Sequence, residues 1–322
     1  MRKWILIVAV AALLALPGRG WAWNNAGHMT VALLAWKELT PEQQKQVSEI
    51  LKTHPHYKQL VLDTKAPNVD EGAWAFMKFA TWPDWVRPAR PGGADSYKTP
   101  AITRYHRGEW HYINMPYFVG GYHGPATKPS SGPANILTAL ADNRRTFGTS
   151  SAKAEDRAVA LAWLEHLVGD VHQPCHAATM YSERFPMGDK GANDQMVASD
   201  DGPKRVHAYW DDLMGKDASY TDVDALTKQL AAKDDEKLKA QAKDENFQTW
   251  AKESHDLAIK TVYLNGDLKT ALSQDWEQKK IAPDKVPAVP AGYHQKAREV
   301  AEVRVLLAGH RLAAQVAEAL AH

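Results

Sequence analysis

The spacing of apolar residues indicates a mostly helical protein. Apolar side chains three and four residues apart are the pattern of an amphipathic helix. Helices are expected on this basis at residues 27–39, 41–52, 70–79, 134–146, 152–171, 206–214, 223–233, 246–264 and 292–320. The second of these begins with Thr40-Pro41-Glu42, which combines an N-cap residue, a first-turn proline and an acidic first turn.

Other segments depart from helical spacing. Residues 109–118 alternate and are rich in Trp, Tyr and Ile, which favours a short strand or hairpin. The charged run 233–237 is expected to be a solvated helix face or a turn. Loops are expected at residues 91–100, 119–132 and 181–203, and a proline-rich linker at 281–290. We predict an all-α fold, mainly helical with a short β-hairpin, in a single domain over residues 23–322.

The first 22 residues have the composition of a secretory signal peptide. A basic start precedes an apolar run over residues 4–16, which is too short to span a membrane, and small residues lie at Gly20 and Ala22. We expect cleavage between Ala22 and Trp23. The protein is therefore expected to be periplasmic or extracellular.

Charge and cysteine content limit the kinds of partner and cross-link. Residues 1–22 carry three of the 39 basic residues and no acid, so the mature chain has 36 basic and 38 acidic residues. A protein that binds nucleic acid mainly by neutralising phosphates is usually clearly basic. Any phosphate-binding charge is therefore expected to be local, for example from metal ions. The single cysteine, Cys175, excludes an intramolecular disulfide.

Histidines and aspartates gather in residues 163–176. His166 and Asp170 are four residues apart, so they share one face of a helix. Pro174 should end that helix, which lets His176 fold back towards the same region. Imidazole and carboxylate ligands suit Zn²⁺ and are costly to bury without a metal. The alternative is a surface helix with a few histidines. Cys175 is expected to be a buried neutral thiol rather than a ligand.

Three other segments place ligand-type residues in apolar surroundings. Asp84 lies between two tryptophans, and His111 lies in the aromatic segment 109–118. His207 and Asp211 repeat the four-residue spacing on another predicted helix. A histidine beside tryptophan is often a core residue, so each signal is weak alone. Together they favour a metal centre.

Signal cleavage would also expose a chelating group. The free α-amino group of Trp23, with a pKa of about 7.7–8.0, is partly neutral at physiological pH. With the Trp23 carbonyl oxygen it can chelate a metal through a five-membered ring, and His28 lies five residues further on. The alternative is that Trp23 is an ordinary apolar anchor.

These features resemble a known family. The chain is similar to the single-strand-specific, trinuclear-zinc nucleases of fungi and plants and their bacterial relatives, which share a helical fold with zinc-dependent phospholipases C. The resemblance spans the mature chain. It rests on the N-terminal Trp with a His five residues on, a Trp-x-Asp-Trp-like element, a Trp-His segment, Gly-Asp-x-His-Gln-Pro-x-His and His-x-x-Trp-Asp.

The resemblance implies three Zn²⁺ ions. The first would be bound by Asp84, His111, His166 and Asp170. The second would be bound by the amine and carbonyl of Trp23, by His28 and by the other oxygen of Asp170. The third would be bound by His176, His207 and Asp211. His172, in the same motif, is expected to orient a carboxylate or a backbone group.

The resemblance also implies residues that act on the substrate. Arg87 matches a basic residue that the family places against the phosphate. Without the resemblance, a surface arginine is an equally good interpretation. Asn114 stands where many members have an Asp proposed to orient the attacking water. Asn193, within Gly191-Ala192-Asn193 where Gly-Gly-Asn is usual, is expected to contact a base or phosphate. Most aromatic residues are expected in the core, with base stacking assigned to rim candidates Tyr112, Tyr117, Tyr122 and Tyr181.

The expected activity follows from the ions. Three Zn²⁺ and three aspartates give the site a charge of about +3, which attracts phosphodiesters to a nearly neutral protein. Water that bridges a close zinc pair is acidified and attacks phosphorus in line, and the third zinc stabilises the departing 3′-oxygen. The expected substrates are RNA, single-stranded DNA and 3′-nucleotides, with 5′-phosphate products from the polymers. We expect a monomer without a stable protein partner.

Two alternatives remain open. A phospholipase C of the same fold would have a longer gap between the N-terminal Trp and its His, and a Glu in place of Asp211. A non-catalytic zinc-binding protein would store the metal without turnover.

Overall fold

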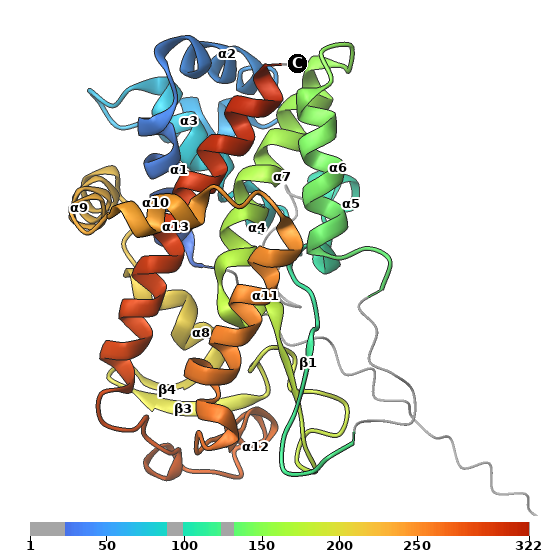
Figure 1. Ribbon diagram of the computed structural model, residues 1–322, viewed down its shortest axis with the longest axis vertical. Coiled ribbons are helices and arrows are strands. Elements are labelled where there is room, and N and C mark those ends of the chain that lie inside the picture. Colours follow the sequence, from blue (N-terminus) through green and yellow to red (C-terminus); the bar gives the residue numbers. More distant parts are fainter. Residues whose placement is uncertain (1–22, 89–98, 124–131, 322) are drawn as a thin grey trace, which may run out of the picture.

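The computed structural model describes residues 23–88, 99–123 and 132–321. The predicted signal peptide and most of the predicted loops at 91–100 and 119–132 lie outside the described residues. Helices dominate the arrangement, as the sequence predicted, and the all-α class is confirmed (Figure 1).

Three buried helices form the centre of the fold. α1 (Asn25–Glu38), α7 (Ala154–His172) and α13 (Tyr293–Leu320) pack against one another, and α13 runs almost the full length of the molecule (Figure 1). α7 is buried all round over residues 160–172, which is typical of a helix inside a core rather than at its surface. Polar side chains on this part of α7 therefore face protein and need partners there.

The other helices surround this centre. They are α2 (Pro41–Leu51), α3 (Glu71–Phe79), α4 (Trp82–Trp85), α5 (Thr99–Tyr105), α6 (Ile136–Gly148), α8 (Val206–Asp211), α9 (Tyr220–Ala231), α10 (Glu236–Ala242), α11 (Phe247–Leu257) and α12 (Ser273–Glu277). Two 3₁₀ turns, η3 (Gly108–His111) and η4 (Pro174–Ala177), carry residues of the site. The described residues also contain two π-helical turns, η1 (Lys58–Leu62) and η6 (Ala258–Val262), and three further 3₁₀ turns, η5 (Asp212–Met214), η7 (Leu264–Gly266) and η8 (Pro283–Lys285).

The strands are short and form two small sheets. β1 (Pro116–Phe118) pairs in parallel with β2 (Thr179–Tyr181). β3 (Gln195–Ser199) lies between β4 (Gly202–Arg205) and β5 (Ala271–Leu272), antiparallel to both. The first sheet leads away from η3 and η4, so it holds those two turns side by side.

The position of the hairpin differs from the prediction. Residues 109–118 divide into η3 and β1, and β1 pairs with a strand 63 residues later rather than with a neighbour. The hairpin is β3–β4, which begins inside the predicted loop 181–203 and ends two residues beyond it. Its turn contains Asp201-Gly202, and Gly202 has φ of 98°. A glycine with positive φ directly after a two-residue turn is a common hairpin feature, which could have indicated this pair of strands.

Some helix predictions also need correction. α5 and α10 were not predicted, and α10 begins inside the charged run 233–237 because Asp235 caps it, accepting from Leu238 N at 2.8 Å. The predicted helix 246–264 is α11 followed by the π-helical turn at Ala258–Val262. The predicted linker 281–290 contains one 3₁₀ turn, Pro283–Lys285.

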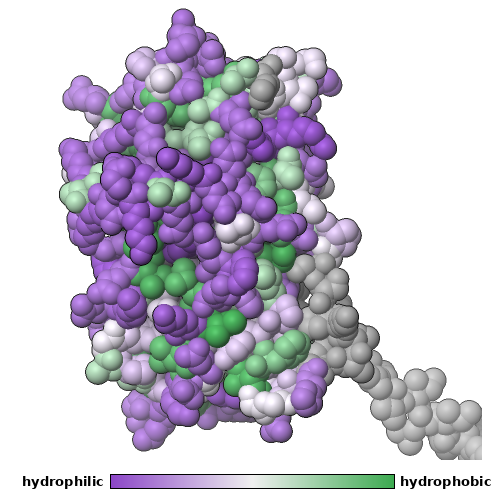
Figure 2. Space-filling model, in the orientation of Figure 1, coloured by the Kyte–Doolittle hydropathy of each residue, from purple (hydrophilic) through white to green (hydrophobic). Residues whose placement is uncertain are grey.

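The surface is mostly hydrophilic on the face that Figure 2 shows, and hydrophobic side chains there form small separate groups. Within the described residues, no helix is long and apolar enough to cross a membrane.

Candidate metal centre

The fold gathers three groups of metal-ligand side chains, all buried. The groups are His28, His166 and Asp170; Asp84, His111 and His166; and His176, His207 and Asp211. Within each group one potential ligand atom per residue lies within 4.8 Å of the others. They come from α1, α4, η3, α7, η4 and α8. All eight side chains that the sequence singled out are therefore brought into these groups.

α7 is common to two of the groups because His166 and Asp170 leave it on one face. Gly169 lets α1 approach that face: a Cβ at this position would lie 2.7 Å from His28 Nδ1. The His28 ring stacks on the His166 ring, with centroids 4.0 Å apart and planes inclined by 16°. The glycine thus determines how closely the His28 donor approaches α7.

The two oxygens of Asp170 face different histidines. Oδ2 lies 2.9 Å from His111 Nδ1 and 3.1 Å from His166 Nε2. Oδ1 lies 3.3 Å from His28 Nε2. Burial alone would raise the pKa of the Asp170 carboxyl, but the nearby His166 and His176 and hydrogen bonds from His111 and His166 hold it well below its usual range. The carboxylate is therefore ionised and lies between the two groups.

Two of the facing histidines are kept neutral. Burial, and next His166, lower the pKa of His28 to about 4. Burial, and next Arg87, lower the pKa of His111 to about 3. A neutral imidazole is the form that binds a metal ion.

Backbone carbonyls fix the tautomers of three histidines. His166 Nδ1 lies 2.8 Å from the Ala80 carbonyl oxygen. His176 Nδ1 lies 2.5 Å from the His111 carbonyl oxygen, and His207 Nδ1 lies 2.6 Å from that of Gly191. A carbonyl oxygen only accepts, so each Nδ1 carries the proton. In the neutral ring each Nε2 is then a lone-pair donor towards the centre.

Two of these lone pairs point at each other. His176 Nε2 and His207 Nε2 are 3.0 Å apart. Two acceptors at this separation repel unless a positive ion lies between them. The donor set, imidazoles with carboxylates, is the one that Zn²⁺ prefers. The residues therefore fit metal ions on the chemistry of their donors.

Asp211 supports the same conclusion for the third group. Its Oδ1 accepts from Gln173 Nε2 at 2.7 Å, while its buried Oδ2 has no hydrogen-bond partner among the described residues and lies 3.8 Å from His207 Nε2. Burial raises the pKa of the Asp211 carboxyl well above its usual range. A cation beside Oδ2 would remove this cost.

Trp23 lies beside this group. Its side chain is fully buried, and the next residue, Asn24, donates its backbone N–H to the Asp211 carbonyl oxygen at 3.2 Å. Asn24 also caps α1 by accepting from Gly27 N at 3.2 Å. The start of the described chain is thus attached to α8. Chelation by the Trp23 amine stays a prediction.

Arg87 is a neighbour of the centre rather than a surface arginine. Its Nε lies 2.8 Å from Asp84 Oδ1, and its side chain is only 11% exposed. Burial acts to raise the pKa of Asp84, but Arg87 and the nearby histidines lower it overall. The guanidinium follows Asp84 by one helical turn and is held against a predicted ligand.

The other predicted residues lie around the centre at different depths. Asn114 is half-buried and accepts from Thr179 Oγ1 at 2.8 Å, so it joins the starts of the two sheet segments. Asn193 is 3% exposed, and its Nδ2 lies 3.0 Å from His207 Nδ1 and 2.9 Å from the Lys190 carbonyl oxygen. Asn193 is therefore placed behind His207. Its contact with a base or phosphate stays a prediction.

His172 and Cys175 do not belong to the three groups. His172 Nδ1 lies 2.8 Å from the Val168 carbonyl oxygen, and its Nε2 lies 2.8 Å from Arg311 Nη1. Its ring therefore braces the last turn of α7 against α13. Cys175 is buried, and burial raises the pKa of its thiol well above the usual value, as expected for a neutral thiol.

The tyrosine candidates for base stacking differ in exposure. Tyr112 is 37% exposed, whereas Tyr181 is buried at 6% and packs against Phe118. Tyr117 is half-buried and stacks on Tyr263. Tyr122 donates its hydroxyl to the Pro186 carbonyl oxygen at 3.1 Å. Tyr112 is the candidate whose position beside His111 suits a ligand at the centre.

The predicted loop at residues 181–203 orients His207, a role that sequence reasoning missed. Lys190, Gly191 and Ala192 have φ of 57°, 63° and 63°, so three successive residues are left-handed. The buried Asp189 anchors this turn by accepting from Ala192 N at 3.0 Å and Gln195 Nε2 at 2.8 Å. Burial raises the pKa of Asp189 to about 6. The sequence Gly-Asp-Lys-Gly-Ala-Asn at residues 188–193 is typical of a turn and could have indicated this left-handed turn.

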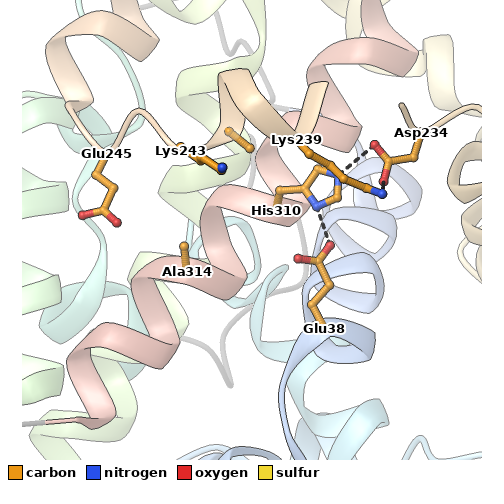
Figure 3. A pocket seen from close by; sticks show the side chains of 8 residues that line it. Glu38, Asp234, Lys239, Lys243, Glu245, His310 and Ala314 are labelled. Carbon is orange, nitrogen blue, oxygen red and sulfur yellow. Dashed lines mark hydrogen bonds and ion pairs between the residues drawn. The ribbon is translucent and has the colours of Figure 1, made fainter. Parts of the chain in front are cut away.

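A cavity of about 570 Å³ lies away from the three groups. His310 borders it and joins two carboxylates, with Nδ1 2.6 Å from Glu38 Oε1 and Nε2 3.1 Å from Asp234 Oδ1 (Figure 3). None of the metal-ligand residues lines this cavity. The contacts of His310 with Glu38 and Asp234 join α13 to α1 and to the connection from α9 to α10.

Known proteins match the chain over nearly its whole length. The S1/P1 nuclease family model matches residues 23–321. Nuclease S1 of Aspergillus oryzae (strain ATCC 42149 / RIB 40) is 22% identical over 311 residues, which cover 96% of this chain and 96% of that protein.

Proposed function

The chain belongs to the S1/P1 nuclease family, and on this premise we propose that it is an exported, zinc-dependent endonuclease for RNA and single-stranded DNA that also removes the phosphate of 3′-nucleotides. As a member of the family it is a nuclease, a hydrolase that acts on nucleic acids. The polymer products would carry 5′-phosphates.

The observation that carries the metal assignment is the pair of facing imidazoles. His176 and His207 direct Nε2 lone pairs at each other from 3.0 Å, and carbonyls hold both rings in that tautomer. The three groups of histidine and aspartate side chains support the proposal of three Zn²⁺ ions. Asp84, His111, His166 and Asp170 would hold the first, Trp23, His28 and Asp170 the second, and His176, His207 and Asp211 the third.

When bound, the ions supply Lewis-acid polarisation of the phosphate and acidify a water molecule. The chain's own residues place the substrate for that chemistry. Arg87 can direct its guanidinium to a non-bridging phosphate oxygen, because its ion pair with Asp84 already fixes it beside the first group. Asn114 offers an amide for hydrogen bonding near His111. Asp170 connects the first two groups, because one of its oxygens faces His28 and the other faces His111 and His166.

The burial of the donors supports a preference for single strands. The eight side chains of the three groups are each at most 5% exposed, so the phosphate must approach a recessed site. A flexible single strand can present its phosphate to such a site with its bases splayed out, whereas a stacked duplex cannot do so easily.

Product analysis on defined oligonucleotides tests the proposal. The purified protein should cleave an RNA and a single-stranded DNA of the same sequence, leave the duplex largely intact and yield 5′-phosphates. Asp170→Asn, at the shared carboxylate, serves as the inactive control. Turnover of phosphatidylcholine vesicles without cleavage of RNA would favour the phospholipase C alternative. Zinc binding with no turnover of either substrate would favour the storage alternative.

A further inference from the structure

A second cavity, of about 350 Å³, borders the metal centre but contains none of its ligand residues. It lies where the end of α5, the turn η3, α6 and the first half of α7 meet. This volume is within the range of about 300–1,000 Å³ that small-ligand sites occupy. The lining residues that bear on its chemistry are Tyr105, Arg107, Trp110, Lys153, Asp156 and Trp163.

Two tryptophans form an aromatic wall of this cavity. Trp110 and Trp163 pack edge to face with ring centroids 4.9 Å apart. Trp163 is 2% exposed, whereas Trp110 is only half-buried and keeps part of its indole open. The Arg107 guanidinium carbon lies 5.7 Å from the Trp110 ring centroid. A partly open indole with a cation at its face suits a planar, electron-rich ring such as a nucleobase.

The charges at the cavity favour an anion. Arg107 and Lys153 are exposed cations, and within the described part of the chain neither forms an ion pair with a carboxylate. Asp156 is the single acid among the lining residues. The net charge of the lining is therefore +1, in a protein that is nearly neutral overall. An aromatic face combined with unpaired cations is the arrangement that binds single-stranded nucleic acid.

Trp163 connects this cavity to the metal centre. Its ring centroid lies 5.3 Å from that of His111 and 6.4 Å from that of His166. Trp110 also directly precedes His111 in η3. One indole thus separates the cavity from two predicted zinc ligands. A strand whose phosphate reaches the ligands can place a neighbouring nucleotide at Trp110.

We propose that this cavity is an accessory subsite for a nucleotide of the substrate strand outside the cleaved phosphodiester. The base stacks on Trp110, and Arg107 and Lys153 contact its phosphate. The inference rests on the proposed nuclease function. It has a consequence that the metal centre alone does not have, because strands long enough to reach both places bind more tightly than dinucleotides.

Binding of uncleaved oligonucleotides tests the subsite directly. Fluorescently labelled phosphorothioate oligothymidylates of two and eight nucleotides, used over times at which they stay intact, are titrated with the full zinc-loaded protein at several salt concentrations. Trp110→Ala should weaken binding of the octamer by about fivefold or more, since stacking contributes about 1–3 kcal/mol per base. The dinucleotide affinity should stay within about twofold.

Arg107→Ala provides a second measurement that does not depend on the packing of the indole. Removal of one phosphate contact should lower the slope of log affinity against log salt for the octamer by about 0.7. Lys296→Ala, an exposed lysine on α13 outside both sites, should leave the octamer affinity and the slope unchanged. The zinc content and melting temperature of each variant establish that the centre is intact. If Trp110→Ala does not fold, Arg107→Ala with Lys153→Ala carries the test.

The outcomes separate the two proposals. Octamer binding that is unaffected by these substitutions overturns the subsite, even if the wild type cleaves RNA. Equal losses for dinucleotide and octamer, together with lost zinc, also overturn it, because Trp110 would then act only through the metal centre. Failure of the wild type to cleave any nucleic acid contradicts the proposed function, while a Trp110-dependent octamer affinity would still support the subsite.

Discussion

Gly169 shows how one missing side chain determines the position of a donor. A Cβ there would lie 2.7 Å from His28 Nδ1, so Gly169→Ala must displace His28 or separate α1 from α7. We expect the variant to lose close to one zinc ion per chain and about 1–3 kcal/mol of stability from overpacking. Elemental analysis and urea denaturation measure the two effects.

The matched control is Gly132→Ala. A Cβ at position 132 would have only the Glu109 carboxylate near it, at 3.7 Å. This variant should retain its zinc content and stability. A Gly169→Ala protein with full zinc content would show that His28 does not depend on the close approach.

Asp211 allows the metal assignment to be tested by opposite effects on stability. Its buried carboxylate has an unpartnered oxygen, so the charge is costly when no cation is present. Asp211→Asn should raise the stability of the metal-free protein by about 1 kcal/mol or more. It should lower the melting temperature of the zinc-loaded protein, because a ligand is lost. Calorimetry with and without a chelator measures both. The same sign of change in the two forms would contradict a metal at Asp211.

At the residue scale, the sequence could predict the donors but not the groups that orient them. His166 and Asp170, like His207 and Asp211, are visible as pairs because helical spacing places positions four apart on one face. The carbonyls of Ala80 and Gly191, which orient His166 and His207, cannot be recognised in the sequence, because any residue type supplies a backbone carbonyl. Gln173, which donates a hydrogen bond to Asp211, lies inside the histidine-rich segment 163–176, but its role depends on a partner 38 residues away.

At the scale of elements, His310 joins three parts of the fold. Its ring lies between Glu38 at the end of α1 and Asp234 between α9 and α10, and Lys239 is 3.9 Å from Asp234 (Figure 3). The hydrogen bond to Glu38 raises the pKa of His310, against the effect of burial. The protonated ring therefore stabilises the folded state below the unfolded pKa of about 6.5, and this contribution is lost as pH rises through the higher folded value.

His310→Gln should therefore destabilise the protein more at about pH 5.5 than at pH 8. Urea denaturation of the variant and the wild type across this range gives the difference, which removes effects common to both proteins. His255→Gln, on α11, is the control, because among the described residues the carboxylate that pairs with this ring is that of Asp256, at 3.7 Å. A difference that grows with pH would contradict the ion-pair role of His310.

Helices were more predictable than strands for a physical reason. α2 is specified locally, since Thr40 and Gln43 form a reciprocal capping box and Pro41 begins the helix. β1 has three residues, and its partner is β2, 63 residues later. Its pairing follows from where η3 and η4 are held, which only the tertiary structure decides. α10 was missed because its seven residues are too few for a clear apolar period.

At the scale of the whole molecule, the proposed signal cleavage and the proposed metal ligation by Trp23 would be linked. The backbone N–H of Asn24 donates to the Asp211 carbonyl oxygen, so the adjacent Trp23 is held near the third group. A protein with one extra residue ahead of Trp23 should bind one zinc ion fewer and lose most of its nuclease activity, because the chelating amine becomes an amide. Native mass spectrometry and product analysis measure both. A one-residue extension after His322 is the control. An N-terminally extended protein with full zinc content would exclude the amine as a ligand.

The three groups join segments that are far apart in the chain. His111 meets Asp170 across 59 residues and His166 across 55, and His176 meets His207 across 31. An ion bound at each place would stabilise the folded state by mass action, because the donors come together only when the chain folds. The chain has one cysteine and no disulfide to serve that purpose. For the proposed exported zinc enzyme, stability would therefore follow the local supply of zinc, and a chelator would act on it as a reducing agent acts on a disulfide-bonded enzyme.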